Sequence, residues 1–87
     1  MQLYLTDRFI ESFRKLDSHS RKAIQKALEL LTVNAEHPSL RTRKMEGYGR
    51  VFEASATMNI RLTFHYGEPD TLVVRNCGHH DDKLGNP

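Results

Sequence analysis

The stretch Ile60-Arg61-Leu62-Thr63-Phe64-His65-Tyr66 decides the fold of this 87-residue chain. Its apolar and polar side chains alternate with a period of two, which is typical of a strand that buries one face. A turn follows at Gly67-Glu68-Pro69-Asp70, and Thr71-Leu72-Val73-Val74-Arg75-Asn76-Cys77 then supplies a second strand. The two strands are predicted to form a hairpin.

The register of this hairpin determines which side chains share a face. We place Leu72 and Val74 on the core face of the sheet. With that register, Arg75 and Cys77 fall on the side of Arg61. The sequence alone does not fix the register, so this assignment stays a prediction.

Upstream of the hairpin, residues 51–56 also alternate and predict a strand, whereas residues before 37 recur with the period of a helix. Thr6 or Asp7 is expected to cap a first helix, a serine within 17–20 a second one, and Asn34 and Pro38 to end the second. Residues 3–5 are expected to begin an edge strand. The helical apolar positions are Phe9, Ile10, Phe13 and Leu16 in the first helix and Ile24, Ala27, Leu28 and Leu31 in the second.

These patterns predict an α+β fold in one domain of residues 1–87, with an N-terminal helical hairpin packed on one face of a small, twisted antiparallel sheet. The other face of the sheet is expected to be partly polar. No apolar run approaches about 18 residues, so we expect no membrane span. Because Cys77 is the only cysteine and no secretion signal is visible, we expect a protein of the reducing cytoplasm.

Positive charge is concentrated in the middle of the chain, although the net charge is only +2. Each of these residues can be an ordinary solvated side chain, but a cluster beside a sheet also suits contacts with phosphate groups. Glu53 can pair with one of the arginines. The cations of residues 37–64 are Arg41, Arg43, Lys44, Arg50 and Arg61.

The end of the chain, Cys77-Gly78-His79-His80-Asp81-Asp82-Lys83-Leu84, gathers two imidazoles and two carboxylates. Adjacent side chains on an extended chain point apart and do not share one tetrahedral ion, so we predict no metal site and no cofactor. A histidine after a glycine at a strand end suits acid–base chemistry instead, because its ordinary pKa of ~6.5 lies near neutrality.

Several blocks of the sequence, in this order and spacing, resemble the RelE/ParE superfamily of toxins from bacterial toxin–antitoxin modules. The resemblance is nearest to the branch of ribosome-dependent mRNA endonucleases that ends in a histidine motif. The blocks are the helical hairpin, His37-Pro38-Ser39-Leu40-Arg41, Lys44-Met45-Glu46-Gly47-Tyr48, Val51-Phe52-Glu53-Ala54, Met58-Asn59-Ile60-Arg61-Leu62-Thr63-Phe64 and Asn76-Cys77-Gly78-His79-His80-Asp81.

This resemblance implies cleavage of mRNA in the ribosomal A site without a metal, by attack of a ribose 2′-hydroxyl on the adjacent phosphate. Arg61 matches the family's strand arginine, which would hold the scissile phosphate. His80 matches the terminal histidine, which would transfer protons, although a one-residue shift of the alignment selects His79. Which residue is the base and which the acid stays open. Arg41, Arg43, Lys44 and Arg50 correspond to the basic segment that approaches RNA and ribosome.

Two further positions are supporting candidates by the same resemblance. Glu53 lies where a neighbouring strand contributes polar side chains to the cleft. Leu84 stands near the position where many relatives have a tyrosine or phenylalanine that stacks on a base. A leucine there removes that expected base stacking.

The resemblance also implies partners: an antitoxin protein, the ribosome with its mRNA, and operator DNA only through the antitoxin complex. No membrane partner is expected. Two alternatives remain open, which are a ParE-like inhibitor of DNA gyrase and a non-catalytic antitoxin-binding module of the same fold. Either of them would need no group for proton transfer.

Overall fold

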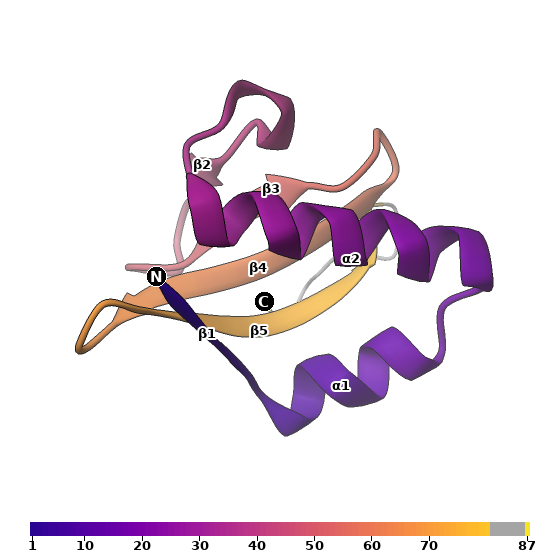
Figure 1. Cartoon of the computed structure of the whole chain (residues 1–87), viewed down its shortest axis with the longest axis horizontal. Helices are drawn as coiled ribbons and strands as arrows, with labels where there is room; N and C mark the ends of the chain where they lie inside the picture. Colours follow the sequence, from indigo (N-terminus) through magenta and orange to yellow (C-terminus); the bar gives the residue numbers. More distant parts are fainter. Residues whose placement is uncertain (81–86) are drawn as a thin grey trace.

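The computed structural model describes residues 1–80 and 87 of the chain. Two helices and five strands follow one another in the order shown in Figure 1. The elements are β1 (Gln2–Leu5), α1 (Asp7–Arg14), α2 (Ser18–Val33), β2 (Arg43–Lys44), β3 (Phe52–Ser55), β4 (Ile60–Gly67) and β5 (Thr71–His79), with a 3-10 turn at Pro38–Leu40 before β2. No helix of this described part is both long and apolar enough to cross a bilayer.

Both helices begin at side-chain caps. Thr6 accepts a hydrogen bond from the Phe9 N–H, so of the two predicted candidates it is the cap of α1. Asp17 accepts from the Ser20 N–H at 2.8 Å and caps α2. The expectation of a serine cap was therefore wrong. Aspartate adds a negative charge at the helix N-terminus, where it is favoured by the helix dipole.

The five strands form one sheet in the order β1-β5-β4-β3-β2. β2 to β5 pair antiparallel, as predicted, but β1 pairs with β5 in parallel, so the sheet is mixed. The chain leaves β1 for the two helices, builds the rest of the sheet and returns to β1 with its last strand. That long crossover permits a parallel pair. β2 is a short strand in the segment that we had predicted only as a basic connection between the helices and the sheet.

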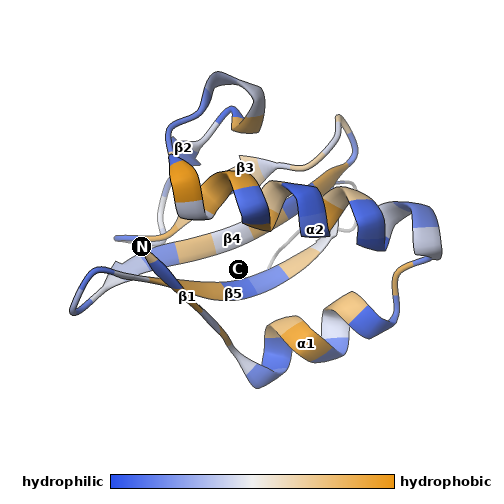
Figure 2. Cartoon of the chain, viewed as in Figure 1, coloured by the Kyte–Doolittle hydropathy of each residue, from blue (hydrophilic) through white to orange (hydrophobic). Residues whose placement is uncertain are grey.

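The core lies between the helices and one face of the sheet. α1 packs against β5 and α2 against β4, and hydrophobic residues recur along these four elements in Figure 2. The stacked rings of Phe52 and Phe64 extend this core toward Tyr66, whose ring meets both of them edge-on. The α+β architecture with both helices packed on the sheet is thus confirmed.

A β-bulge interrupts the pairing of β4 with β5. Phe64 pairs with Val74 and Thr63 pairs with Asn76, so Arg75 has no opposite residue on β4. An extra residue of this kind inverts the side-chain alternation beyond it. Cys77 consequently pairs with Leu62 and is buried in the core. The prediction that Cys77 shares the face of Arg61 was wrong, and the bulge is the reason.

Candidate functional site

The sheet face opposite the helices gathers polar side chains from β2, β3, β4 and β5. Its central residues alternate along β4 with the buried Leu62 and Phe64, and hydrogen bonds join them across the strands. We call this surface the polar face. Its members are Arg43, Glu53, Ser55, Arg61, Thr63, His65 and Arg75.

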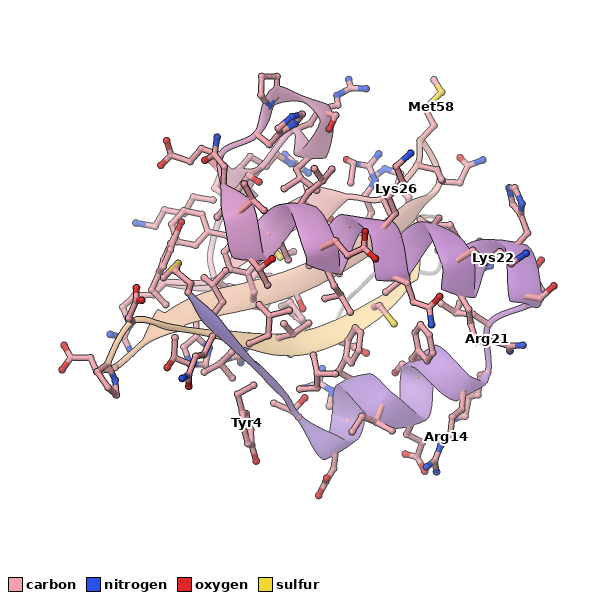
Figure 3. The ribbon with its side chains drawn as sticks, in the orientation of Figure 1. Tyr4, Arg14, Arg21, Lys22, Lys26 and Met58 are labelled. Atoms are coloured by element: carbon pink, nitrogen blue, oxygen red, sulfur yellow. The ribbon has the colours of Figure 1, made fainter. Side chains whose placement is uncertain are left out.

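Arg61 is held against the turn between β3 and β4. Its Nη1 donates to Ser55 Oγ at 2.7 Å, and its Nη2 donates to the Met58 carbonyl oxygen at 2.8 Å. Figure 3 shows Met58 at the tip of this turn. The Arg61 Nε is buried and has no hydrogen-bond partner among the described residues. Ser55 and Met58 therefore fix the guanidinium, and its Nε remains a desolvated donor without a partner among the described residues.

His80 lies at the same end of the sheet as Arg61. The β4–β5 ladder continues beyond His79, since the His80 N–H donates to the Asn59 carbonyl oxygen at 2.6 Å. Gly78 pairs with Arg61, and alternation puts the side chain two residues later on the same face. His80 is exposed there. The register thus brings the His80 backbone beside the turn that holds Arg61, and continued alternation past the end of β5 would put its side chain on the face of Arg61.

His79 belongs to the opposite face. It pairs with Ile60, a core residue, and its charge helps to lower the pKa of Asp17, at the N-terminus of α2. The main causes of that lowered pKa are the hydrogen bonds that Asp17 accepts from Ser20. His79 therefore lies on the side of the sheet opposite to Arg61.

The basic segment is divided by β2. Arg43 faces Glu53 and forms an ion pair with it, with both Nη2 and Nε at 3.0 Å from Glu53 Oε1. Lys44 pairs with Phe52, on the helix side of the sheet. Arg41 and Arg50 are exposed in the flanking connections. These predicted cations do not converge on Arg61.

Glu53 is engaged in structure rather than free for chemistry. It is 5% exposed, and Arg43 is its ion-pair partner. A buried carboxylate matched by a guanidinium is held in one geometry by its partner. Its neighbour across the ladder, Thr63, is fully buried.

Sequence analysis missed a second cluster on the polar face, His65 with Arg75. Arg75 Nη1 lies 2.8 Å from His65 Nδ1. Because a guanidinium only donates, Nδ1 accepts and the imidazole proton is on Nε2. Desolvation, followed by the charges of Arg75 and Arg50, lowers the pKa of His65. The available signal was the spacing: His65 is four residues from Arg61 on one strand and so shares its face.

Cysteine chemistry and metal binding find little support in the described part. Burial raises the pKa of the Cys77 thiol to about 12, so the thiolate is scarce near neutrality. Within residues 1–80 and 87, no three His, Cys, Asp or Glu side chains gather in a way that could hold a metal ion. The predicted supporting residue Leu84, and Asp81 and Asp82, lie outside the described residues.

Chemically, this end of the polar face offers two complementary groups. A fixed guanidinium stabilises negative charge on oxygen, and an exposed imidazole supplies a ring nitrogen that can donate or accept a proton. Such a pair suits a reaction in which charge develops on a phosphate while protons move to and from neighbouring oxygens.

Comparison with solved structures relates the fold to known proteins. The chain is similar to a YoeB/ParE toxin from Agrobacterium tumefaciens, with a TM-score of 0.76 and 15% identity over 92% of this chain and 99% of the other. It is similar to the RelB-RelE antitoxin-toxin complex from Methanococcus jannaschii, with a TM-score of 0.74, 20% identity and coverages of 91% and 92%.

The archaeal RelE-RelB complex from Pyrococcus horikoshii OT3 is a third match, with a TM-score of 0.73, 10% identity and coverages of 90% and 92%. No protein-family model matches the sequence, and no curated protein sequence matches it significantly. The fold is therefore that of the RelE/ParE toxins, as the resemblance of the sequence predicted. At these identities the likeness is one of fold.

Proposed function

We propose that this chain is the toxin of a type II toxin–antitoxin system and that it cleaves mRNA on the ribosome. The observation that supports this most directly is that the Arg61 guanidinium and the His80 backbone both contact the β3–β4 turn, at Met58 and Asn59. The RelE/ParE fold supports the same assignment, since the similar structures are described as toxins and antitoxin-toxin complexes.

In the proposed reaction, a ribose 2′-oxygen attacks the adjacent phosphorus. A bond forms between that oxygen and phosphorus, the bond to the 5′-oxygen breaks, and the products are a 2′,3′-cyclic phosphate and a 5′-hydroxyl. One proton leaves the 2′-hydroxyl and one is gained by the 5′-oxygen. His80 serves one of these transfers, because an imidazole is both a competent base and a competent acid near neutrality.

Arg61 is the proposed electrostatic group. As the phosphorus becomes five-coordinate, negative charge grows on its two non-bridging oxygens, and a guanidinium donates to them in a planar fork. Ser55 and Met58 already fix the Arg61 side chain, so little reorganisation is needed when substrate binds.

The exposed cations extend the proposed RNA and ribosome surface. Arg41, Lys44 and Arg50 are solvent-exposed, and exposed cations contribute a salt-dependent attraction to polyanions. Arg43 is proposed to contribute less, since its charge is matched by Glu53. No cofactor is part of the proposal.

A cognate antitoxin is the proposed protein partner. An acidic or amphipathic segment lying over the polar face would cover Arg61 and silence the site. Operator DNA would be bound through the antitoxin, and the protein would act in the cytoplasm, where ribosomes and mRNA are found.

Primer extension on mRNA from cells that express the chain tests the proposal. Cuts within translated frames are expected for the wild type and for the control Arg14→Ala, since Arg14 is exposed on α1 and lies away from the polar face (Figure 3). Arg61→Ala and His80→Ala should each abolish growth arrest and cleavage. Retained cleavage in both variants would refute the roles assigned here.

The same cultures separate the two alternatives. Induction of DNA damage signalling while translation continues would indicate a gyrase inhibitor in place of a ribonuclease. Unchanged growth after strong expression without an antitoxin would indicate a non-catalytic binding module.

A further inference from the structure

A second cationic cluster lies on the polar face, away from Arg61 and His80. It consists of Arg75 in the bulge of β5 and His65 on β4, joined at 2.8 Å. Arg50 is near enough for its charge to lower the pKa of His65. Both Arg75 and His65 are partly buried, which strengthens their interaction with any charged ligand.

An oxygen acceptor already occupies this cluster. Arg75 Nε donates to the Pro87 carbonyl oxygen at 3.4 Å, and Pro87 is buried. Of the five N–H donors of this arginine, the described residues use two, and they leave Nη2 without a partner. At 3.4 Å this contact is longer than an ordinary N–H···O hydrogen bond. A phosphate oxygen at an ordinary distance would bind the same donor more strongly.

His65 presents the complementary donor. Its Nδ1 accepts from Arg75, so its Nε2 carries a proton that can be donated to the same ligand. A guanidinium and a neutral imidazole N–H side by side suit the oxygens of a phosphodiester. No described Asp or Glu side chain forms an ion pair with Arg75, whereas Arg43 is neutralised by Glu53.

We propose that Arg75 and His65 form a second phosphodiester-binding site, which holds a phosphate of single-stranded RNA other than the scissile one. The inference rests on the proposed ribonuclease function. Arg61 and His65 are four residues apart on β4, which corresponds to about 13 Å along a strand. This separation exceeds one nucleotide step, so the two sites contact different phosphates of one strand. RNA binding displaces the Pro87 oxygen from Arg75.

The shared face favours RNA over an acidic peptide as the occupant. Arg61, His65 and Arg75 all lie on the polar face, so one extended strand can follow β4 from the first site to the second. Binding two phosphates would also fix the register of the strand at Arg61. The cluster would then be a positioning element, because it does not touch the reacting atoms.

Fluorescence anisotropy with a labelled RNA of about 12 nucleotides tests this site. The RNA is 2′-O-methylated so that it cannot be cleaved, and affinity is measured over a range of salt concentrations. A phosphate contact with single-stranded nucleic acid contributes ~0.7 to the slope of log affinity against log salt. Arg75→Gln is expected to lower the slope by about this amount, as is Arg61→Gln, whereas Arg14→Gln leaves it unchanged.

Arg75→Lys controls for loss of folding. It keeps the charge and should keep the slope, with weaker binding, because an ammonium does not reproduce the guanidinium geometry. NMR adds a second readout. RNA should shift the ring resonances of His65 and raise its pKa, through the nearby negative charge, and should leave the ring resonances of His19, exposed on α2, in place.

The outcomes separate this inference from the proposed function. If Arg75→Gln behaves like Arg14→Gln while Arg61→Gln lowers the slope, the second site is wrong and the ribonuclease proposal stands. If the wild type binds no RNA and cuts no mRNA, both are wrong. If Arg75→Gln weakens binding of a poly-glutamate peptide but not of the RNA, the occupant is an acidic peptide and the inference is overturned.

Discussion

The two halves of β5 bury their side chains in opposite phase. In Thr71–Val74, Leu72 and Val74 are buried, as an uninterrupted alternation predicts. In Asn76–His79 the phase is inverted, and Cys77 is the buried residue. The unpaired Arg75 lies between the halves, where the register with β4 shifts.

This difference teaches that one bulge decides which histidine faces Arg61. Without it, alternation from Leu72 and Val74 would bring His79 to the polar face and His80 to the helix side. With it, Gly78 pairs with Arg61 and His80 shares that face. Sequence alignment alone does not choose between His79 and His80, whereas the alternation that follows the bulge favours His80.

The largest expected effect separates these two histidines. His80→Gln should lower mRNA cleavage by about 10²–10⁴-fold, the usual contribution of a positioned proton-transfer group, because glutamine cannot exchange a proton near neutrality. His79→Gln should remain close to the wild type. The measurement is primer extension on ribosome-bound mRNA in a reconstituted translation system.

Loss of cleavage in His79→Gln with activity kept in His80→Gln would reverse the assignment. Thermal unfolding of both variants serves as the control, since each histidine is exposed and its replacement should alter stability little.

Thiol labelling probes the same inversion at Cys77. With the pKa of this thiol raised to about 12 by burial, its thiolate fraction at pH 8 is on the order of 10³-fold below that of an ordinary cysteine. Alkylation of the native protein by iodoacetamide should be slower by at least that factor than alkylation in denaturant. Fast native labelling would mean that Cys77 lies on the solvent-facing side and that the bulge is misplaced.

Unfolding free energies give a third, smaller effect. Cys77→Ser places a hydroxyl group in the core without a hydrogen-bond partner. It should lower the free energy of unfolding, measured in urea, by about 1–3 kcal/mol. Val73→Thr is the matched change before the bulge, on a partly exposed residue that pairs with His65, and should cost much less. Equal losses of unfolding free energy in the two variants would contradict the inverted side-chain alternation in residues 76–79 of β5.

Much of the fold was predictable because it follows from local patterns. The strand at residues 60–66, the two amphipathic helices and the Thr6 cap depend on neighbours in the sequence. The bulge does not. Thr6 Oγ1 donates to the carbonyl oxygens of Val74 and Arg75, and Ser12 Oγ donates to Asn76 Oδ1. These contacts join residues more than 60 positions apart in the sequence, so they cannot be predicted from a local sequence pattern.

The candidate site was predictable to a similar extent. Arg61 and His80 were proposed from resemblance, and the register places both on one face. The ion pair of Arg43 with Glu53 and the cluster of His65 with Arg75 depend on strand pairing. Alternation alone does not give that pairing when a bulge intervenes.

The smallest expected effect concerns Asp17 and reports on the helix side of the sheet. Hydrogen bonds from Ser20, and to a lesser degree the charges of His19 and then His79, lower the pKa of Asp17. A carboxyl group whose pKa is lower in the folded protein stabilises the fold at pH values above its pKa in the unfolded chain. This stabilisation is lost as the pH falls through the pKa of the folded protein.

His79→Gln should therefore raise the pKa of Asp17 slightly, while His80→Gln, on the other face, should leave it where it is. Asp17→Asn keeps a capping oxygen and should remove this acid-dependent contribution altogether. Carboxyl ¹³C NMR titration measures the pKa of Asp17 in His79→Gln and His80→Gln, and acid unfolding measures the effect of Asp17→Asn on stability. If His80→Gln moved the Asp17 titration and His79→Gln did not, the pairing of β5 beyond Arg75 would be wrong by one residue, and the assignment of His80 to the face of Arg61 would fall with it.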